Sequence, residues 1–388
     1  MKRSSGLLRT ARLLAWGLAG TGAGAAAALL ATCGPFTDVA ADAFCPFVVE
    51  IFTLGITTGT TATTYDPSSG VTRLQMAAFL SRSVDGVLKR NKRAALRRFW
   101  TTQGSVNLGL TTAGSSPAFT ESDGADVWVS SGNTVLRVRG SDGRLLETWT
   151  GTGGAAGVLP AMGKIFVAGN QSPGKLYRID PSQPPGLAFL IADVGTGPQG
   201  GITFDGGRIW TANQSSGSIS IVTPTLSIPW TATTVTAGLT GPIGLLFDGA
   251  AVWATDLNAG TLVKLDPNGS VLQTVTVGAV PLYPAFDGAN IWVPNNIDST
   301  ITVVRASNGS VLGTLTGNGM SLPFQAAFDS QRILVTNLSN NSVSLWKAAD
   351  LSPIGNFSTG PASSPGGVCS DGVNFWIVLG GNGQLARF

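Results

Sequence analysis

The sequence contains no histidine, the side chain that most often transfers protons near neutral pH and most often binds transition metals. Its absence excludes Ser-His-Asp sites, Cys-His sites and histidine-based metal sites. Carboxylates, lysine, tyrosine and cysteine remain, but no paired carboxylates at an informative spacing, phosphate-binding glycine loop, calcium loop or CxxC pair is present. We therefore expect no catalytic residue, no metal, no cofactor and a protein that is not an enzyme.

The cysteines allow two interpretations near the N-terminus. Cys33 follows Leu30-Ala31-Thr32, a segment that resembles a bacterial lipobox and would make Cys33 a lipidated first residue. The alternative is a disulfide between Cys33 and Cys45 in an oxidising compartment. Cys369 lies far away in the sequence and is expected to be a small buried hydrophobic residue.

The N-terminus has the pattern of an export signal. Four basic residues precede an uncharged stretch, 13–31, that is rich in Ala, Leu and Gly. We assign residues 1–33 to this signal and expect the mature protein outside the cytoplasm, in a bacterial cell envelope. Retention of the stretch as a membrane anchor is the alternative.

Charge is distributed unevenly along the chain. Residues 1–100 hold 12 Lys/Arg and 5 Asp/Glu, whereas residues 101–388 hold 12 and 16. The larger C-terminal part therefore offers no positive surface for nucleic acid. Six basic residues lie between Lys89 and Arg98; we expect a basic linker at 91–100, with contact to anionic lipids or wall polymers as the alternative.

Residues 34–90 are expected to form a small helical domain. The apolar positions Phe47, Val48, Ile51 and Leu54 have helical spacing and end at Gly55. A second helix is expected after Thr72, which is placed as its N-cap. Its predicted apolar face consists of Leu74, Met76, Ala77, Phe79 and Leu80.

This domain resembles an S-layer homology (SLH) domain. It has the opening Phe-x-Asp-Val at 36–39, the central Gly-Ile-x-x-Gly at 55–59 and a closing Thr-Arg at 72–73. The resemblance implies a module that attaches proteins to cell-wall polysaccharide or peptidoglycan. With a single copy, it also implies weak binding, self-association or a role as a structural cap.

The resemblance implies four glycan-binding positions: Phe44, Thr72, Arg73 and Gln75. Gln75 stands where the family usually has an acidic residue, and Phe44 stands where an aromatic residue, often Trp, is usual. A local ion pair at the start of a helix is the alternative role for Arg73.

The remaining residues, 101–388, contain a seven-fold repeat. Phrases such as "FDGGRIWTAN", "FDGAAVWATD" and "FDGANIWVPN" recur at intervals of 39 to 43 residues. Their anchor positions are Gly124, Gly163, Gly206, Gly249, Gly288, Ser330 and Gly372. This spacing predicts four-stranded blades and a mainly β fold, a seven-bladed β-propeller.

Each repeat predicts four short antiparallel strands joined by Asp-Gly and Asn or Asp turns. The segment 105–114 has the character of a fourth strand that completes the last blade and closes the ring. Five tryptophans share one position and are expected to pack between blades: Trp128, Trp210, Trp253, Trp292 and Trp376.

The repeats resemble bacterial propellers of the YVTN/NHL type, with Val335-Thr336-Asn337 nearest to that pattern. Propellers related to these include a streptogramin lyase, whose family mechanism is thought to need histidine and a metal. The absence of histidine argues against that activity here.

Turn residues that follow the shared tryptophan position are expected to gather on one rim of the ring, where loops could hold a ligand. These candidates are Asn213, Asp256, Asn295 and Asn337. Turn formation alone is the alternative explanation for Asn and Asp at these positions.

Together these patterns favour an exported binding or scaffold protein that the SLH-like domain attaches to cell-wall glycan, while the propeller rim binds a protein, peptide or glycan. Two alternatives are a carboxylate-based glycan lyase or hydrolase on the propeller and a structural surface-layer component.

Overall fold

The computed structural model describes residues 32–33, 35–40, 45–53, 57–91, 110–236 and 238–388. The chain divides into two compact units, Met1–Val87 and Leu88–Phe388. Most of the predicted export signal, Phe44 and the basic linker beyond Asn91 lie outside the described residues. Among the described helices, none combines the length and the apolar character needed to cross a membrane.

The first unit contains one two-stranded sheet and two helices: β1 (Thr32–Cys33), β2 (Phe36–Ala40), α1 (Cys45–Thr53) and α2 (Arg73–Asn91). Its small core is centred on the fully buried Phe36, whose ring contacts Phe52 and Tyr65. Both helices coincide with helical segments predicted from the apolar spacing.

The predicted apolar face of α2 is not covered by the described part of the chain. The side chain of Leu74 is 85% exposed, and Met76 and Leu80 are also exposed. The apolar spacing therefore identified the helix correctly but not its packing.

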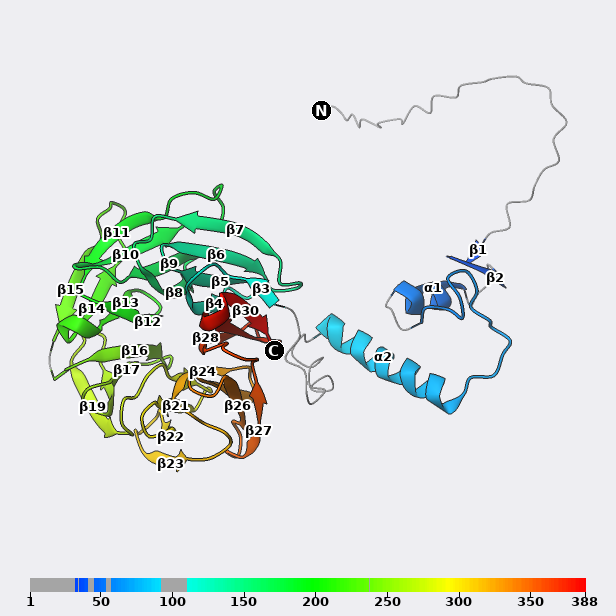
Figure 1. Ribbon diagram of the computed structural model, residues 1–388. Helices are drawn as coiled ribbons and strands as arrows, with labels where there is room; N and C mark the ends of the chain where they lie inside the picture. The colour runs from blue at the N-terminus through cyan, green and yellow to red at the C-terminus, as the bar shows by residue number, and fades with distance from the viewer. Residues whose placement is uncertain (1–31, 34, 41–44, 54–56, 92–109, 237) are drawn as a thin grey trace, which may run out of the picture. The chain divides into compact units, whose positions relative to one another are not determined.

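The second unit is a ring of seven four-stranded antiparallel sheets, as the repeat spacing predicted (Figure 1). Blades 1 and 2 are β4 (Pro117–Ser122), β5 (Asp126–Ser131), β6 (Thr134–Arg139), β7 (Leu145–Thr150) and β8 (Ala155–Ala161), β9 (Lys164–Gly169), β10 (Gly174–Ile179), β11 (Phe189–Val194). Blades 3 and 4 are β12 (Pro198–Phe204), β13 (Ile209–Asn213), β14 (Ser218–Thr223), β15 (Thr231–Val235) and β16 (Pro242–Phe247), β17 (Val252–Asp256), β18 (Thr261–Leu265), β19 (Val271–Thr276). Blades 5 and 6 are β20 (Ala285–Phe286), β21 (Asn290–Asn295), β22 (Thr300–Arg305), β23 (Val311–Leu315) and β24 (Pro323–Phe328), β25 (Arg332–Asn337), β26 (Ser342–Lys347), β27 (Pro353–Ser358).

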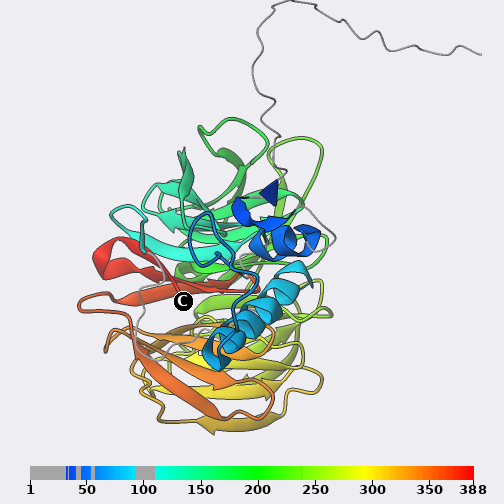
Figure 2. The ribbon, with the colours of Figure 1, turned by 90° about the vertical axis from the view of Figure 1, so that its right-hand side faces the viewer.

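Blade 7 joins the two ends of the unit and confirms the predicted closure. It consists of β28 (Pro365–Ser370), β29 (Phe375–Leu379), β30 (Gln384–Arg387) and β3 (Leu110–Thr112). β3 pairs with β30, with Thr111 opposite Leu385. In both views the red C-terminal strands lie between the cyan-green first blade and the orange sixth blade (Figure 1, Figure 2).

The core of the ring lies between its blades. Seven hydrophobic clusters each combine residues of two neighbouring blades. All five tryptophans of the shared position are fully buried in these clusters, as predicted. Replacing such a buried indole by alanine costs about 3 to 5 kcal/mol, so each contributes substantially to holding two blades together.

The first strands of neighbouring blades contact one another and surround the axis. Glycines allow this approach, since a Cβ on Gly157, Gly201 or Gly244 would overlap a backbone carbonyl of the next blade. The inner ring is therefore close-packed on one side of the axis, where these blades lie.

Candidate functional site

In the first unit, Thr72 and Gln75 cap the start of α2. The Gln75 backbone N–H donates to Thr72 Oγ1 over 3.2 Å, and the Thr72 backbone N–H donates to Gln75 Oε1 over 2.9 Å. This reciprocal pair is a capping box, in which Gln75 takes the place of an acidic residue. Arg73, the first residue of α2, lies between Thr72 and Gln75 in the sequence and is exposed.

Two further residues of the SLH-like pattern hold the unit together. Asp38 accepts hydrogen bonds from the backbone N–H groups of Tyr65 and Asp66, and the bond from Tyr65 lowers the pKa of this carboxyl. Gly59 has φ +78°, and a Cβ there would overlap the Phe36 ring and the Thr64 carbonyl. The pattern therefore fixes the path of the chain around Phe36.

The cysteines differ in state. Cys45 is disulfide-bonded. The backbone of Cys33 lies in β1, but its side chain is outside the described part of the structure. Cys369 is a free, buried thiol whose pKa is raised by burial and by the nearby Glu121, which confirms its expected role as a small buried residue.

The four rim candidates lie at the expected end of the ring, but they are all fully buried. Asn213 and Asn337 each donate to two serine hydroxyls of the next strand, and Asn295 donates in the same way to Thr300 and Thr302. Asp256 accepts from the N–H and the hydroxyl of Thr240. These side chains therefore hold loops in place and do not present themselves to a ligand.

The loops around them form a face that is almost without charge. We call it the loop face: the loops from each fourth strand to the next first strand, 113–116, 151–154, 195–197, 236–241, 277–284, 316–322 and 359–364, and the turns between second and third strands, 132–133, 170–173, 214–217, 257–260, 296–299, 338–341 and 380–383. Gly, Ser, Thr, Asn and Gln dominate it, and Asp298 is the one charged residue in its described loops.

The opposite end, the turn face, carries the charges. Its turns contain Asp123, Asp142, Arg144, Asp180, Asp205, Arg208, Asp248, Asp266, Asp287, Asp329, Asp350 and Asp371. Because this contrast runs around the whole ring, the two faces suit different ligands, and the loop face suits an uncharged one.

An aromatic hub lies on the axis beside the loop face. Phe119, Tyr283 and Phe324 come from blades 1, 5 and 6, and their ring centroids are 4.8 to 5.9 Å apart. Leu257 and Val280, which belong to loops of the loop face, pack against the same cluster. Phe119 and Phe324 remain partly exposed, so the centre of the loop face is apolar and ringed by amides and hydroxyls.

The hub is anchored across the ring. The Tyr283 hydroxyl donates to the carbonyl of Gln199 in blade 3 over 2.6 Å. A Cβ on Gly200 would overlap the Phe119 ring, so glycine makes room for the phenylalanine. The backbone of blade 3 at Gln199 and Gly200 thus packs against Tyr283 of blade 5 and Phe119 of blade 1.

On the turn face, one interaction repeats in five blades. The indole Nε1 of each shared tryptophan donates over 2.8 Å to an aspartate five residues earlier, in Asp123–Trp128, Asp205–Trp210, Asp248–Trp253, Asp287–Trp292 and Asp371–Trp376. Burial alone would raise the pKa of Asp123, Asp205 and Asp248, but the indole and backbone N–H donors outweigh it and lower the pKa of all three. These aspartates are structural acceptors.

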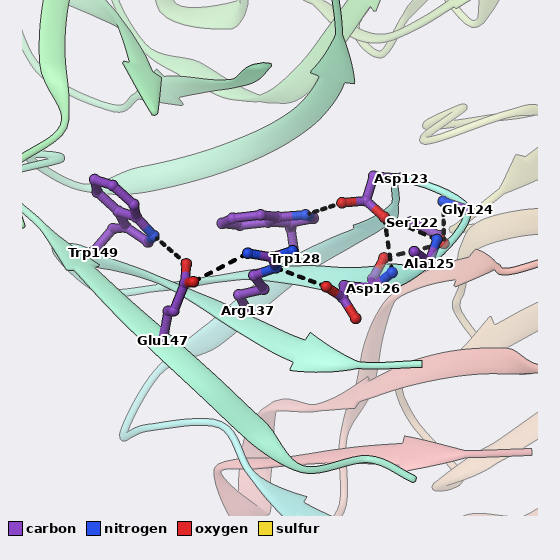
Figure 3. A network of polar contacts seen from close by, with 9 residues as sticks. All are labelled: Ser122, Asp123, Gly124, Ala125, Asp126, Trp128, Arg137, Glu147 and Trp149. Carbon is purple, nitrogen blue, oxygen red and sulfur yellow. Dashed lines mark hydrogen bonds and ion pairs between the residues drawn. The ribbon is translucent and has the colours of Figure 1, made fainter. Parts of the chain in front are cut away.

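Blade 1 extends this interaction into a network (Figure 3). Arg137 Nε contacts Asp126 Oδ2 at 2.7 Å and its Nη1 contacts Glu147 Oε1 at 3.0 Å. Glu147 also accepts from Trp149 Nε1, and the Arg137 guanidinium lies 5.4 Å above the Trp128 ring. Two carboxylates thus meet here, but both are bound by Arg137, so they do not form the free pair that a glycoside hydrolase needs.

A groove of about 690 Å³ lies on the turn face between blades 5 and 6. Its lining includes Asp287 and Arg332, but Asp287 already accepts from Trp292 and Asn290, and Arg332 is paired with Asp329. Asp287 and Arg332 are therefore engaged in the fold, and Lys347 is the remaining charged residue in the lining.

Sequence reasoning missed both the hub and the Asp–Trp pairs. The constant five-residue spacing between Asp and Trp was a usable signal for the pairs. The hub had none, since its three rings occupy different blades and only the closed ring brings them together.

No family model matches the sequence, and no curated protein does. Solved structures do resemble the propeller. A streptogramin B lyase is 16% identical, with a TM-score of 0.59 over 72% of this chain and 96% of its own. A catalytically inactive histidine-to-alanine variant of virginiamycin B lyase from Staphylococcus aureus, solved with quinupristin, is 15% identical, with a TM-score of 0.60 over 72% and 98%. The WD40 propeller domain of Doa1 is 14% identical, with a TM-score of 0.59 over 71% and 92%.

These likenesses show a shared fold, and they correct one expectation. The expectation that the chain is not an enzyme is wrong, because the propeller's structural neighbours include lyases. The absence of histidine excludes particular catalytic groups; it does not exclude catalysis on this fold.

Proposed function

We propose that this chain is an exported cell-envelope protein whose first unit attaches to wall glycan and whose loop face binds an uncharged, polar ligand. The observation that carries the proposal is the loop face itself, where amide and hydroxyl loops with one charged residue surround a partly exposed aromatic hub. Apolar sites with a few well-placed polar groups are typical of ligand binding on rigid folds.

The attachment part rests on the SLH-like pattern and on the roles of its residues. Phe36, Asp38 and Gly59 fix the path of the chain, and the capping box starts α2 immediately before the exposed Arg73. An exposed guanidinium at a helix N-terminus suits hydrogen bonding to sugar hydroxyls or carboxylates.

Attachment is tested by co-sedimentation of the mature chain with purified sacculi at low and high salt. We expect salt-resistant binding that is lost on deletion of residues 34–90 and weakened by Arg73→Ala, while Arg73→Lys retains part of it. Binding that survives the deletion would show that another part of the chain attaches to the wall.

Ligand binding is tested with the chain lacking residues 34–90. This chain is immobilised, a wall digest is passed over it, and the retained compounds are identified by mass spectrometry. We expect uncharged compounds to be retained, and to be lost from a Ser116→Arg, Ser339→Arg double variant. Both serines are exposed on the loop face, in loops of blades 1 and 6, which also supply Phe119 and Phe324 to the hub. Retention that the double variant leaves unchanged would exclude the loop face.

A lyase is the second candidate function, and the observation that favours it is the likeness to streptogramin B and virginiamycin B lyases. The inactive Staphylococcus aureus variant lacks one histidine, and this chain has none, so any base would have to be of another kind. Incubation with quinupristin followed by chromatography tests this: time-dependent loss of the compound supports a lyase, and an unchanged amount excludes this substrate.

A further inference from the structure

A second groove, which we call the Asp298 groove, lies beside the loop face, between the outer strands of blades 4 and 5. It has a volume of about 340 Å³, and its lining includes four threonines and one carboxylate: Thr276, Thr300, Thr302, Thr314 and Asp298. It therefore combines the one charged side chain of the loop face with a cluster of hydroxyls.

Asn295 orients two of these hydroxyls. Its Nδ2 donates to Thr300 Oγ1 over 3.0 Å and to Thr302 Oγ1 over 2.9 Å, while its Oδ1 accepts from the Gly278 N–H over 3.0 Å. Each threonine oxygen is thus used as an acceptor, and its own proton is left to donate elsewhere.

In blade 6 the equivalent hydroxyl groups, those of Ser342 and Ser344, do have acceptors for their protons. Asn337 donates to Ser342 and Ser344 in the same way, but there Ser342 donates onward to Asn340 Oδ1 over 2.7 Å and Ser344 to the Asn318 carbonyl over 2.8 Å. Within the described part of blade 5 and its surroundings, neither Thr300 nor Thr302 has a corresponding acceptor.

Asp298 supplies the complementary acceptor. Its Oδ2 accepts from the Ala279 backbone N–H over 2.7 Å, which fixes the carboxylate in place. Its Oδ1 has no donor among the described residues. The groove therefore offers hydroxyl donors beside a charged acceptor, and no cationic side chain lines it.

This combination fits the hydroxyl groups of a sugar, which both donate and accept. A carboxylate accepts from a sugar hydroxyl, and threonine hydroxyls donate to neighbouring sugar oxygens. An acidic sugar would be repelled by Asp298, and a metal ion would need more ligand charge than one carboxylate provides. We propose that this groove binds a neutral sugar unit of a glycan, an inference that rests on the proposed ligand-binding function of the loop face.

The test uses calorimetric titration of the mature chain with chitotriose, cellotriose, maltotriose and, as an acidic probe, trigalacturonic acid. We expect at least one neutral trisaccharide to bind and the acidic one not to bind. Asp298→Asn and Thr314→Val should each weaken binding about tenfold, the loss expected for one hydrogen bond.

Two matched variants serve as controls. Thr234→Val changes the residue of blade 3 that pairs with Ser220, as Thr314 pairs with Thr302 in blade 5. Asp266→Asn changes an aspartate of the turn face. Both should bind like the parent chain.

Absence of binding by every neutral trisaccharide, or binding that Asp298→Asn and Thr314→Val leave unchanged, would overturn the sugar groove. The wall-digest experiment separates this result from failure of the proposed function: if an uncharged compound is still retained there and lost from the double serine variant, the loop face binds another ligand and only the groove is excluded.

Discussion

The half-buried Glu121 and the buried Cys369 are neighbours on the inner strands of blades 1 and 7, where the ring closes. Burial raises the pKa of Glu121 to about 7 and raises that of Cys369 well above its usual value, with the Glu121 charge adding to the effect on the thiol. Thr120 Oγ1 lies 3.7 Å from the Cys369 sulfur. Two groups that favour the neutral state are thus placed at the joint between the first and last blades.

Stability should depend on the protonation of Glu121. Between its usual pKa near 4.5 and its folded value of about 7, the folded chain keeps a proton that the unfolded chain has released, so stability falls as pH rises through this range and levels off above it. We expect the free energy of unfolding, measured with urea, to be about 1 to 2 kcal/mol lower at pH 7.5 than at pH 5. This is less than the full pKa shift implies, because Glu121 is partly exposed. Glu121→Gln should remove this dependence; an equal fall in the variant would contradict the assignment.

At the scale of the blade, the Asp–Trp pair links the turn between the first two strands to the core between blades. The aspartate accepts two backbone N–H bonds with one oxygen and the indole N–H with the other, as Asp248 does for Ala250, Ala251 and Trp253. Blade 6 lacks the tryptophan, and there Asp329 binds Arg332 instead. In blade 6 the turn therefore keeps its acceptor function although the indole is absent, whereas blade 2 has neither the aspartate nor the tryptophan.

Asp248→Asn should destabilise the propeller by about 1 to 2 kcal/mol, since the charged acceptor of a buried indole N–H is lost. Because the pKa of Asp248 is lowered in the folded chain, its contribution is present above its unfolded pKa and is lost as pH falls through the folded value. Urea unfolding at pH 7 and pH 3 should therefore differ less in the variant than in the parent.

Asp266→Asn is the control, because Asp266 bonds only to backbone N–H groups in its turn. A loss of stability at pH 7 as large as that of Asp248→Asn would assign the effect to turn chemistry alone and not to the indole.

At the scale of the whole molecule, the ring depends on a three-residue strand. β3 completes blade 7 from the N-terminal side, and without it β30 would present an unpaired edge. The two ends of the unit are thus joined by hydrogen bonds between residues far apart in the sequence.

Two truncations test this closure. A chain beginning at residue 105 keeps β3, and one beginning at residue 113 removes it. We expect the shorter chain to melt at a lower temperature with a broader transition and to self-associate through the β30 edge, as measured by calorimetry and gel filtration. Identical melting of the two chains would show that the ring does not need β3.

The sequence predicted the ring because its repeats specify turns locally: in five of the seven blades the Asp of the turn and the shared Trp interact across five residues. The burial of the rim candidates could not be predicted for a related reason. The side-chain amide of a residue such as Asn213 donates to a hydroxyl of the next strand, and residue type alone does not reveal this. The hub and the Asp298 groove depend on contacts between blades, so no single repeat encodes them.

The burial of the five paired tryptophans has a spectroscopic consequence. Five indoles share one environment, each hydrogen-bonded to a carboxylate at 2.8 Å, and no tryptophan lies between residues 32 and 87. The chain has ten tryptophans, of which eight lie in the propeller and two, Trp16 and Trp100, lie outside the described residues. Emission from the indoles of the propeller should therefore change when the propeller unfolds. The first unit, which contains α1 and α2, can be followed in the same sample by circular dichroism at the helical band, so the melting of the two units can be observed separately without labels.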